Sequence, residues 1–352
     1  MKRSQMQDTR RKVGDLGSVL GAEEIMLADG AARGLRCYEV KNGRGLSLRV
    51  LKDRGMDIAG LCYQGRQMAF LSKTGLRHPA FYREEGARGF LKQFHAGLLT
   101  TCGLSYAGAA FEEDGQGYGL HGPYNNTPSQ QAAAFVDSQE EDVVIRLRGE
   151  VKQSQVFGEN LVLTREITVE TEADRLHIKD SVENQGFVDS PLMLVYHINF
   201  GYPLLDAGAK VYTSAGSITP RDEAARGGLA RWNLMDEPEA DRPEECFFHA
   251  NHPESAFAMI YNERLGMACA IEYKAGQLPL LVEWKCMREG DYALGLEPTT
   301  SGVLGRPAAR TDGSLVTLKP GEQKRFDLTL TFMDKAADIQ AFIQRSGENS
   351  TN

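Results

Sequence analysis

Alternation of apolar and polar residues is the feature of this chain that most restricts its fold. The pattern is clearest in residues 46–51, 143–151, 161–170, 175–184 and 324–332. A period of two places one face of a strand on a core and the other face toward water. Short turn sequences rich in Asn, Asp, Gly and Pro separate these segments. Many strands joined by short turns predict an all-β fold of large antiparallel sheets packed face to face.

Helical patterns are few. Residues 335–345 predict a C-terminal helix, and residues 3–14 predict a second short one. The region 220–245 is rich in charged residues, Gly and Pro, and it predicts a long surface excursion. We expect the chain to fray from about Ser346. No shift in composition marks a boundary to a second large domain.

Bulk properties exclude several classes of protein. The 352 residues carry a net charge of −8, which argues against nucleic acid and anionic membranes as partners. No apolar run reaches the roughly 18–20 residues that span a bilayer. The N-terminus lacks the apolar core of a secretory signal. Six dispersed cysteines without a Cys-x-x-Cys pair favour buried, reduced thiols. Together these features predict a cytoplasmic protein.

Two histidines and one glutamate lie at the ends of predicted strands: His121, His197 and Glu297. Imidazole and carboxylate groups are well suited to exchange protons near neutral pH. Glycine on both sides of His121 lets a ligand approach the backbone closely, although either histidine could instead be a buried structural residue. Glu297 follows an apolar strand, and desolvation there would raise its pKa toward the range of a general base.

Other residues compete for the same chemistry. Glu283 lies in a similar apolar run, and it could instead form a structural ion pair with Lys285 or Arg306. Arg54 interrupts a strand pattern with Gly and further charges. It could reach into a site as a fork of donors oriented by Asp57, or it could belong to a charged turn.

Residues 93–127 are the densest polar stretch. They include His95, for which site and structural roles are equally supported, and Asn125 and Asn126, whose amides suit hydroxyl groups. His249 and His252 have metal-ligand spacing but no third ligand nearby, which favours a surface loop. Dinucleotide, phosphate-loop and nucleophile-elbow motifs are absent from the sequence. We therefore expect no cofactor and no metal.

The stretch from Leu161 to Asp206 resembles the central part of galactose mutarotase-like (aldose 1-epimerase) proteins. The stretch from Leu294 to Glu322 resembles their closing segment, in which Leu-Glu precedes a loop and then Leu-x-Pro-Gly-Glu. Three further motifs resemble the DUF4432 branch, which includes deoxyribose-mutarotase-like members. These motifs are Arg54-Gly-Met-Asp-Ile, Gly97-Leu-Leu-Thr-Thr-Cys-Gly-Leu, and Gly119-Leu-His-Gly with Asn126-Thr-Pro.

The resemblance implies a β-supersandwich with the site in a groove on one concave sheet. It implies that Glu297 is the general base, that His197 is the general acid, and that His121 and Arg54 hold the substrate. The family's substrate-binding Asp has no clean match, and His249, Asn251 or Glu283 could take its place. The expected organisation is an N-terminal extension (1–34), the supersandwich domain (35–335) and a C-terminal helix with a frayed tail (336–352).

The expected function is interconversion of the α and β anomers of a free sugar by acid–base ring opening and closure. Two alternatives stay open: a carbohydrate-binding module without catalysis, and another acid–base sugar isomerase on the same scaffold. The expected partner is a small-molecule sugar, with no nucleic acid and no membrane, and the chain could form a homodimer. Candidate substrate contacts beyond His121 are Arg54, His95, Asn126, Glu283 and Lys285. A sugar phosphate would require Lys285, Arg288 and Arg306 to converge.

Overall fold

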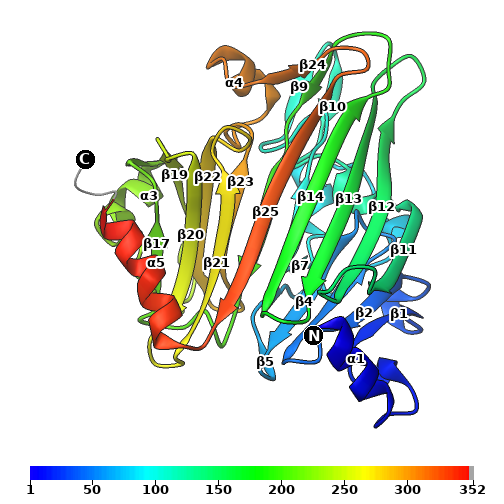
Figure 1. Ribbon diagram of the computed structural model, residues 1–352. Helices are drawn as coiled ribbons and strands as arrows, with labels where there is room; N and C mark the ends of the chain where they lie inside the picture. The colour runs from blue at the N-terminus through cyan, green and yellow to red at the C-terminus, as the bar shows by residue number, and fades with distance from the viewer. Residues whose placement is uncertain (349–352) are drawn as a thin grey trace.

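The computed structural model describes residues 1–348 and consists mainly of two large antiparallel sheets, which confirms the predicted all-β class (Figure 1). The first sheet has eleven strands in the order β1-β2-β3-β4-β8-β16-β23-β22-β19-β18, with β5 paired to β4. Its strands are β1 (Gly21–Met26), β2 (Arg36–Lys41), β3 (Leu46–Leu51), β4 (Asp57–Tyr63), β5 (Arg66–Gln67), β8 (Leu99–Cys102), β16 (Val195–Phe200), β18 (Ser217–Pro220), β19 (Glu245–Ala250), β22 (Leu280–Arg288) and β23 (Asp291–Thr299).

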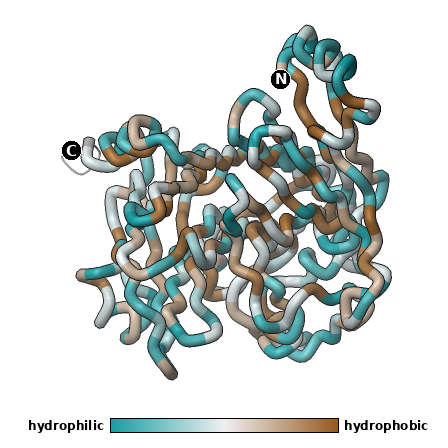
Figure 2. Tube along the Cα trace, turned by 90° about the horizontal axis from the view of Figure 1, so that it is seen from below, coloured by the Kyte–Doolittle hydropathy of each residue, from teal (hydrophilic) through white to brown (hydrophobic). Residues whose placement is uncertain are grey.

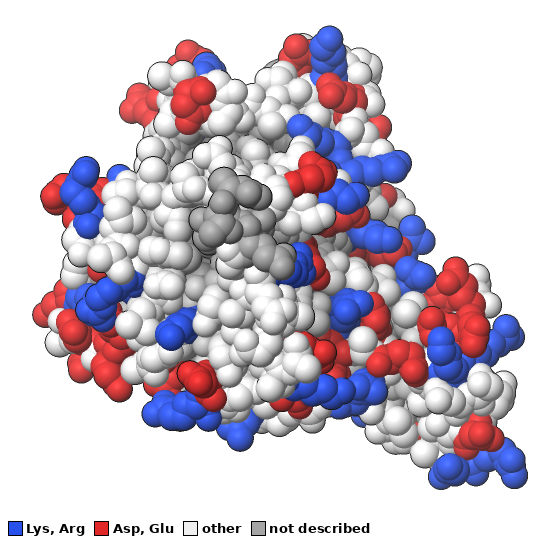
Figure 3. Space-filling view, turned by 60° about the vertical axis from the view of Figure 1, so that its left-hand side comes forward, with Lys and Arg blue, Asp and Glu red and all other residues white. Residues whose placement is uncertain are grey.

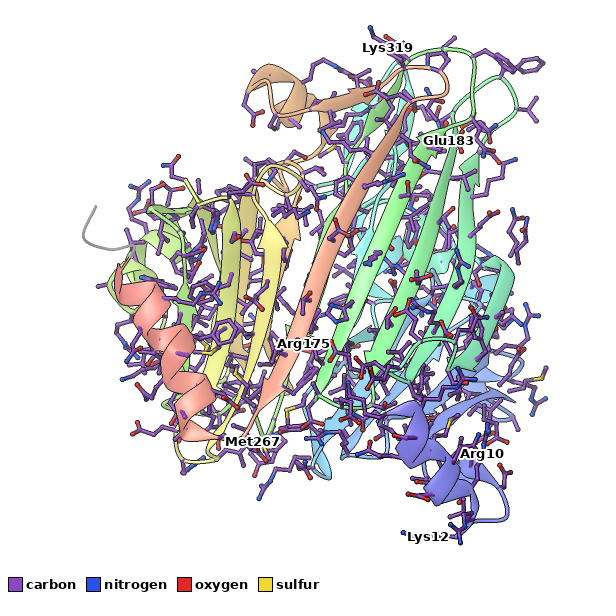
Figure 4. The ribbon with its side chains drawn as sticks, in the orientation of Figure 1. Arg10, Lys12, Arg175, Glu183, Met267 and Lys319 are labelled. Carbon is purple, nitrogen blue, oxygen red and sulfur yellow. The ribbon has the colours of Figure 1, made fainter. Side chains whose placement is uncertain are left out.

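The second sheet has eight strands in the order β11-β12-β13-β14-β25-β21-β20-β17. They are β11 (Gln130–Asp137), β12 (Val144–Ser154), β13 (Asn160–Glu170), β14 (Arg175–Asn184), β17 (Lys210–Thr213), β20 (Ser255–Asn262), β21 (Met267–Lys274) and β25 (Gln323–Met333). The last strand, β25, lies between β14 and β21, so the end of the chain joins the two halves of the sheet. Arg175 and Glu183 mark the two ends of β14 (Figure 4).

The remaining elements are short. Three strand pairs lie outside the large sheets: β6 (Phe70–Leu71) with β7 (Ala96–Gly97), β9 (Phe111–Glu113) with β10 (Gln116–Tyr118), and β15 (Ser190–Leu192) with β24 (Val316–Leu318). The α-helices of the described chain are α1 (Arg3–Arg10), α2 (Ala87–Leu91), α3 (Glu223–Gly228), α4 (Arg306–Thr311) and α5 (Ala336–Glu348). Single 3₁₀ turns are η1 (Leu16–Ser18), η2 (Gly30–Ala32), η3 (Pro79–Phe81), η4 (Tyr124–Asn126) and η5 (Leu229–Arg231).

The two terminal helices differ in length from the sequence prediction. Helix α1 ends at Arg10 because the backbone N–H groups of Lys12 and Val13 both donate to the carbonyl of Thr9, which closes the last turn. Helix α5 ends at Glu348, two residues beyond Ser346, from which we expected the chain to fray. The last four residues, 349–352, lie outside the described residues. Helix α1, beside the N mark, and helix α5 lie on opposite sides of the molecule (Figure 2).

The main core lies between the two sheets. It is built from the inward-facing residues of both, such as Tyr196 and Leu296 from the first sheet and Ile178 and Phe326 from the second. All four are fully buried. The alternation seen in the sequence therefore fills one continuous apolar layer, and the other face of the first sheet remains available for a site.

A buried ion-pair network ties the two sheets together. Arg165 on β13 donates to Asp57 on β4 over 3.0 Å and to Asp180 on β14 over 2.6 Å. All three side chains are fully buried. The hydroxyl of Tyr196 on β16 also donates to Asp180, over 2.8 Å. Because each charge has several partners, this network meets the condition under which buried ions are tolerated.

Charged side chains of both signs are intermixed around the face shown in Figure 3, and a wide uncharged area lies between them. Among the described residues, no helix is long and apolar enough to cross a membrane.

Candidate active site

Strand alternation sets His197 and Glu297 on the same face of the first sheet. On β16, Tyr196 and Ile198 point into the main core, so His197 between them points to the opposite face. On β23, the neighbouring Leu296 points into the core in the same way. The pairs Val195↔Thr299 and Ile198↔Leu296 flank the two residues and place them opposite each other. His197 Nε2 lies 3.3 Å from Glu297 Oε1.

A cavity of about 420 Å³ opens over this pair. Its polar lining consists of His121, His197, Arg221, Glu244, Trp284 and Glu297. Its apolar walls include Phe90, Leu91, Phe94, Leu120, Val303 and Leu304. The floor therefore comes from the strands, and the walls come from α2 and the neighbouring loops. The volume lies in the range typical of small-molecule sites, which is roughly 300–1,000 Å³.

Glycine next to His121 has a steric role. The chain turns at His121 and Gly122 with φ values of +62° and +74°. A Cβ on Gly122 would lie 2.5 Å from the backbone oxygen of Gly103, so only glycine fits there. The close approach that the sequence predicted is thus made to the protein's own backbone, and it turns the His121 imidazole into the cavity.

Aromatic rings surround the two imidazoles. The His197 ring centroid lies 5.1 Å from that of Phe94, 5.5 Å from that of Trp284 and 5.7 Å from that of His121. Nδ1 of His121 and Nδ1 of His197 are buried without a hydrogen-bond partner among the described residues. Such groups are costly to bury without a partner.

Burial shifts the proton affinities of the pair in opposite directions. Burial lowers the pKa of His197 to about 3, and the nearby His121 adds to the effect. Burial raises the pKa of Glu297 well above its usual value; Glu244 adds to this rise and Arg221 opposes it. Burial also lowers the pKa of His121 to about 4. Burial therefore favours the uncharged forms of the acid and base groups in this site.

Two charged residues of the cavity, Arg221 and Glu244, were not predicted from the sequence. Glu244 accepts hydrogen bonds from Trp284 Nε1 over 2.7 Å and from Arg221 over 2.9 Å. Arg221 also donates to Asp222 over 2.8 Å. Arg221 and Glu244 stand at the two ends of the 220–245 excursion, where a high content of charged residues gave no signal for a site. The alternation of side chains along β22 indicates that Trp284 lines the cavity. Trp284 is two residues from Val282 and faces the same way, and Val282 pairs with Glu297.

Glu283 and Lys285 lie on the opposite face of β22 from the cavity. Glu283 is fully buried, and its Oε2 lies 2.9 Å from His249 Nε2. The ammonium group of Lys285 donates to the carbonyl oxygens of Arg231 and Leu234 over 2.9 and 2.8 Å. Glu283, the alternative to Glu297 in the sequence, therefore points away from the cavity, because successive side chains of a strand face opposite sides of the sheet.

Arg54, His95 and Asn126 meet in a second buried cluster, and none of them lines the cavity. Arg54 donates to Asn126 Oδ1 and to the carbonyls of Gln93 and Asn125, each over 3.0 Å. Burial lowers the pKa of His95 well below its usual value, and the positive charge of Arg54 adds to this. Their role as substrate contacts remains a prediction without a supporting contact. Asp57, which we expected to orient Arg54, pairs with Arg165 instead.

The remaining charged candidates are dispersed. Arg306 donates to Glu113, and Arg288 donates to the carbonyl of Arg242, so neither converges with Lys285 on a phosphate-sized site. Asn251 donates to Ser217 at the surface. Among the described residues, no cluster of three or more His, Cys, Asp or Glu could hold a metal ion.

Comparison with solved structures gives strong matches for the whole fold. A Klebsiella pneumoniae protein described as a candidate aldose 1-epimerase is 27% identical, with a TM-score of 0.89 over 98% of this chain and 91% of that one. A galactose mutarotase-like protein from Clostridium acetobutylicum is 15% identical, with a TM-score of 0.63 over 90% and 100% of the two chains. Galactose 1-epimerase from Lactobacillus acidophilus is 14% identical, with a TM-score of 0.58 over 89% and 99%.

A comparison with curated proteins finds no match. Residues 32–332 match the model of a family described as a domain of unknown function, DUF4432. This match covers most of the chain and includes the strands that carry His197 and Glu297. The chain therefore belongs to the DUF4432 family, and it has the fold of the galactose mutarotase-like proteins.

Proposed function

We propose that this protein is an isomerase of the aldose 1-epimerase type, which interconverts the α and β anomers of a free sugar. The observation that carries the proposal is the His197–Glu297 pair. Its two proton-exchanging atoms lie 3.3 Å apart on the floor of a small-molecule cavity. The similarity to candidate aldose 1-epimerases supports the same reaction class.

The reaction requires one group that accepts a proton and one that donates a proton. Glu297 takes the proton from the C1 hydroxyl, and His197 gives a proton to the ring oxygen. The C1–ring-oxygen bond breaks, and C1 becomes an aldehyde. Rotation about C1–C2 presents the other face of the carbonyl, and the reverse proton transfers close the ring as the other anomer. No proton or electron is gained or lost overall.

The proposed reaction requires that His197 and Glu297 together hold one exchangeable proton. When two coupled groups share a proton, the charged form (His⁺ with Glu⁻) and the neutral form (His with Glu-H) belong to the same protonation state. Burial favours the neutral form, because it lowers the pKa of His197 and raises that of Glu297. Transfer of the proton to His197, across a distance of 3.3 Å, makes the acid that the reaction requires.

The other polar groups of the cavity suit a sugar. Trp284 offers an aromatic face to the C–H side of a ring, and Glu244 and Arg221 offer an acceptor and a donor for hydroxyls. The imidazole of His121 lines the same cavity and offers one more polar contact. These residues orient the substrate, while His197 and Glu297 exchange its protons.

The test is anomer exchange measured by NMR magnetisation transfer on a panel of free aldoses. Glu297→Gln keeps the shape of the side chain but removes its basic function, and it should lower the exchange rate by about 10²–10⁴-fold. Glu289→Gln is the matched control, since residue 289 is exposed and outside the cavity. An unchanged rate in Glu297→Gln would refute the assignment. No exchange of any aldose by the wild-type protein would refute the function.

A second measurement separates mutarotation from other sugar isomerisations. Ring opening and closure break no C–H bond, so turnover in deuterated water should leave every carbon-bound hydrogen of the sugar in place. Incorporation of deuterium at a carbon would point instead to an isomerase that removes a proton from carbon.

A further inference from the structure

The cavity over His197 and Glu297 is poor in positive charge. Among the described residues that line it there is one arginine, Arg221, and no lysine. Two carboxylates already bind this arginine: its Nε donates to Asp222 over 2.8 Å, and its Nη2 donates to Glu244 over 2.9 Å. The guanidinium and its two partners together therefore carry one positive and two negative charges.

The carboxylate of Glu244 is held from two directions. One oxygen accepts from Arg221, and the other accepts from Trp284 Nε1 over 2.7 Å. Trp284 stands on β22, which pairs along its length with β23, the strand that carries Glu297. The side chain of Glu244 is 45% exposed and lines the cavity, so a ligand there meets its charge directly.

The other cations near the site do not line the cavity. Lys285 lies on the opposite face of β22, where its ammonium group binds backbone carbonyls. Arg306 donates to Glu113 over 2.6 Å. Arg88 and Lys92, at α2, are exposed side chains outside the lining. Arg221 is therefore the one cation of the described lining that an anionic group of a substrate could use, and its charge is already balanced.

An anionic group on a substrate would share this space with the carboxyl groups of Glu244 and Glu297. The charge of Glu244 already raises the pKa of Glu297, and a second anion would act in the same direction. Burial lowers the pKa of His121 to about 4, so its imidazole adds no positive charge at neutral pH. Like charges brought together weaken binding strongly. Hydroxyl groups have no such penalty, and carboxylate oxygens accept hydrogen bonds from them.

We propose that the substrate is an aldose without an anionic group, and that Glu244 sets this specificity by binding the cation that a phosphate or carboxylate would require. This inference rests on the proposed mutarotase function. Neutral aldoses, and aldoses that carry an ammonium group, fit the charges of the cavity. Sugar phosphates and uronates do not. Glu244 is thus a specificity-determining residue of the proposed reaction.

The experiment compares sugars that differ in charge. Anomer exchange by NMR, corrected for the rate without protein, gives kcat/KM for glucose, glucose 6-phosphate, 6-O-acetylglucose and glucosamine. Galactose is compared with galacturonate, and ribose with ribose 5-phosphate. Wherever the neutral sugar is accepted, its anionic partner should be poorer by at least about 100-fold, because like-charge contacts have effects of this size. The acetyl ester controls for the size of the group at C6 and should lose less than the phosphate.

Two further measurements test the role of charge. Salt screens exposed charges, so the difference between neutral and anionic sugars should narrow as the ionic strength of the wild-type assay rises from about 20 to about 500 mM. Glu244→Gln keeps the size of the side chain but removes its charge, and it should raise the anion-to-neutral ratio of kcat/KM about tenfold. Glu289→Gln removes an exposed carboxylate outside the cavity and should leave the ratio unchanged. The salt series needs no variant, which covers the case in which Glu244→Gln does not fold.

The outcomes separate this inference from the function beneath it. If sugar phosphates or uronates exchange as well as their neutral partners, the charge-based specificity is refuted and the mutarotase function stands. The same holds if the acetyl ester loses as much as the phosphate and salt changes neither. An unchanged ratio in a folded Glu244→Gln variant would refute the role of Glu244. If no sugar exchanges, the proposed function is refuted and the inference falls with it.

Discussion

Gly295 lies directly beneath Glu297: a Cβ at position 295 would stand 2.7 Å from Glu297 Oε1. The same Cβ would lie 3.2 Å from His197 Cε1 and 3.2 Å from the Cβ of Trp284. Three residues of the cavity floor therefore depend on the absence of a side chain at one point of β23.

Gly295→Ala should reduce anomer exchange while leaving the fold intact. The added methyl group forces the carboxylate of Glu297 away from His197, and a displacement of about 1 Å in a catalytic site costs about 10²-fold in rate. Gly227→Ala is the control, because a Cβ there meets nothing within 4 Å. Thermal unfolding should show both variants folded. A fully active Gly295→Ala would contradict the tight packing of the pair.

Anomer exchange should have a bell-shaped pH profile with a broad plateau around neutrality. The active pair holds one proton. It gains a second proton as the pH falls toward the lowered pKa of His197, about 3, and it loses its last proton as the pH rises through the raised pKa of Glu297. The rate measured by NMR from pH 3 to 10 tests this. An acid limb centred near 6.5, the pKa of an ordinary histidine, would contradict it.

The fold should lose stability on mild acidification because of His121. Burial lowers the pKa of His121 from 6.5 to about 4, so between these values the unfolded chain binds more protons than the folded one. The stabilisation is complete above pH 6.5, and about 3 kcal/mol of it is lost as the pH falls through 4. His121→Asn, which tolerates the positive φ, should flatten the dependence of urea midpoints on pH between 6.5 and 4. An equal slope in wild type and variant would exclude this contribution.

Arg165→Met should be strongly destabilising. It leaves the carboxylates of Asp57 and Asp180 buried without their cation, a change that costs about 3–5 kcal/mol. Arg148→Met removes an exposed arginine that pairs with Glu166 at the surface and should cost less than about 1 kcal/mol. Urea unfolding at neutral pH measures both. Similar midpoints for the two variants would show that the buried network adds little to stability.

The strand pattern predicted the architecture well because its physical cause is local. Tyr196 and Ile198 are apolar and face the core, so His197 between them faces the other way. Glu297 faces the same way as His197, because its neighbour Leu296 also points into the core. The same alternation would have excluded Glu283 from the cavity if the register between β22 and β23 had been known, because Glu283 pairs with the core residue Leu296. That register depends on tertiary pairing, which the sequence of one strand does not contain.

The ligand-contact residues were harder to predict. Arg54 and Asn126 stand in motifs rich in polar residues, but Arg54 donates to Asn126 and to nearby carbonyls. Both ring nitrogens of His95, in the same stretch, are buried without a hydrogen-bond partner among the described residues. Arg221 and Glu244 lie in a segment with no periodic pattern, and only its folding back onto Trp284 brings them to the cavity. A polar residue in a loop can either form structural hydrogen bonds or line a cavity. Which of these it does depends on parts of the chain that are distant in sequence.

Two consecutive residues of β22 hold the 220–245 excursion from opposite sides of the sheet: Trp284 binds Glu244, and Lys285 binds the carbonyls of Arg231 and Leu234. Between Leu234 and Glu244, the backbone of Glu239 pairs with Met287 and Glu289, and Arg288 donates to the carbonyls of Asp241 and Arg242. Strand β22, which also pairs with the strand that carries Glu297, therefore fixes this wall of the cavity and the Glu297 carboxylate relative to each other.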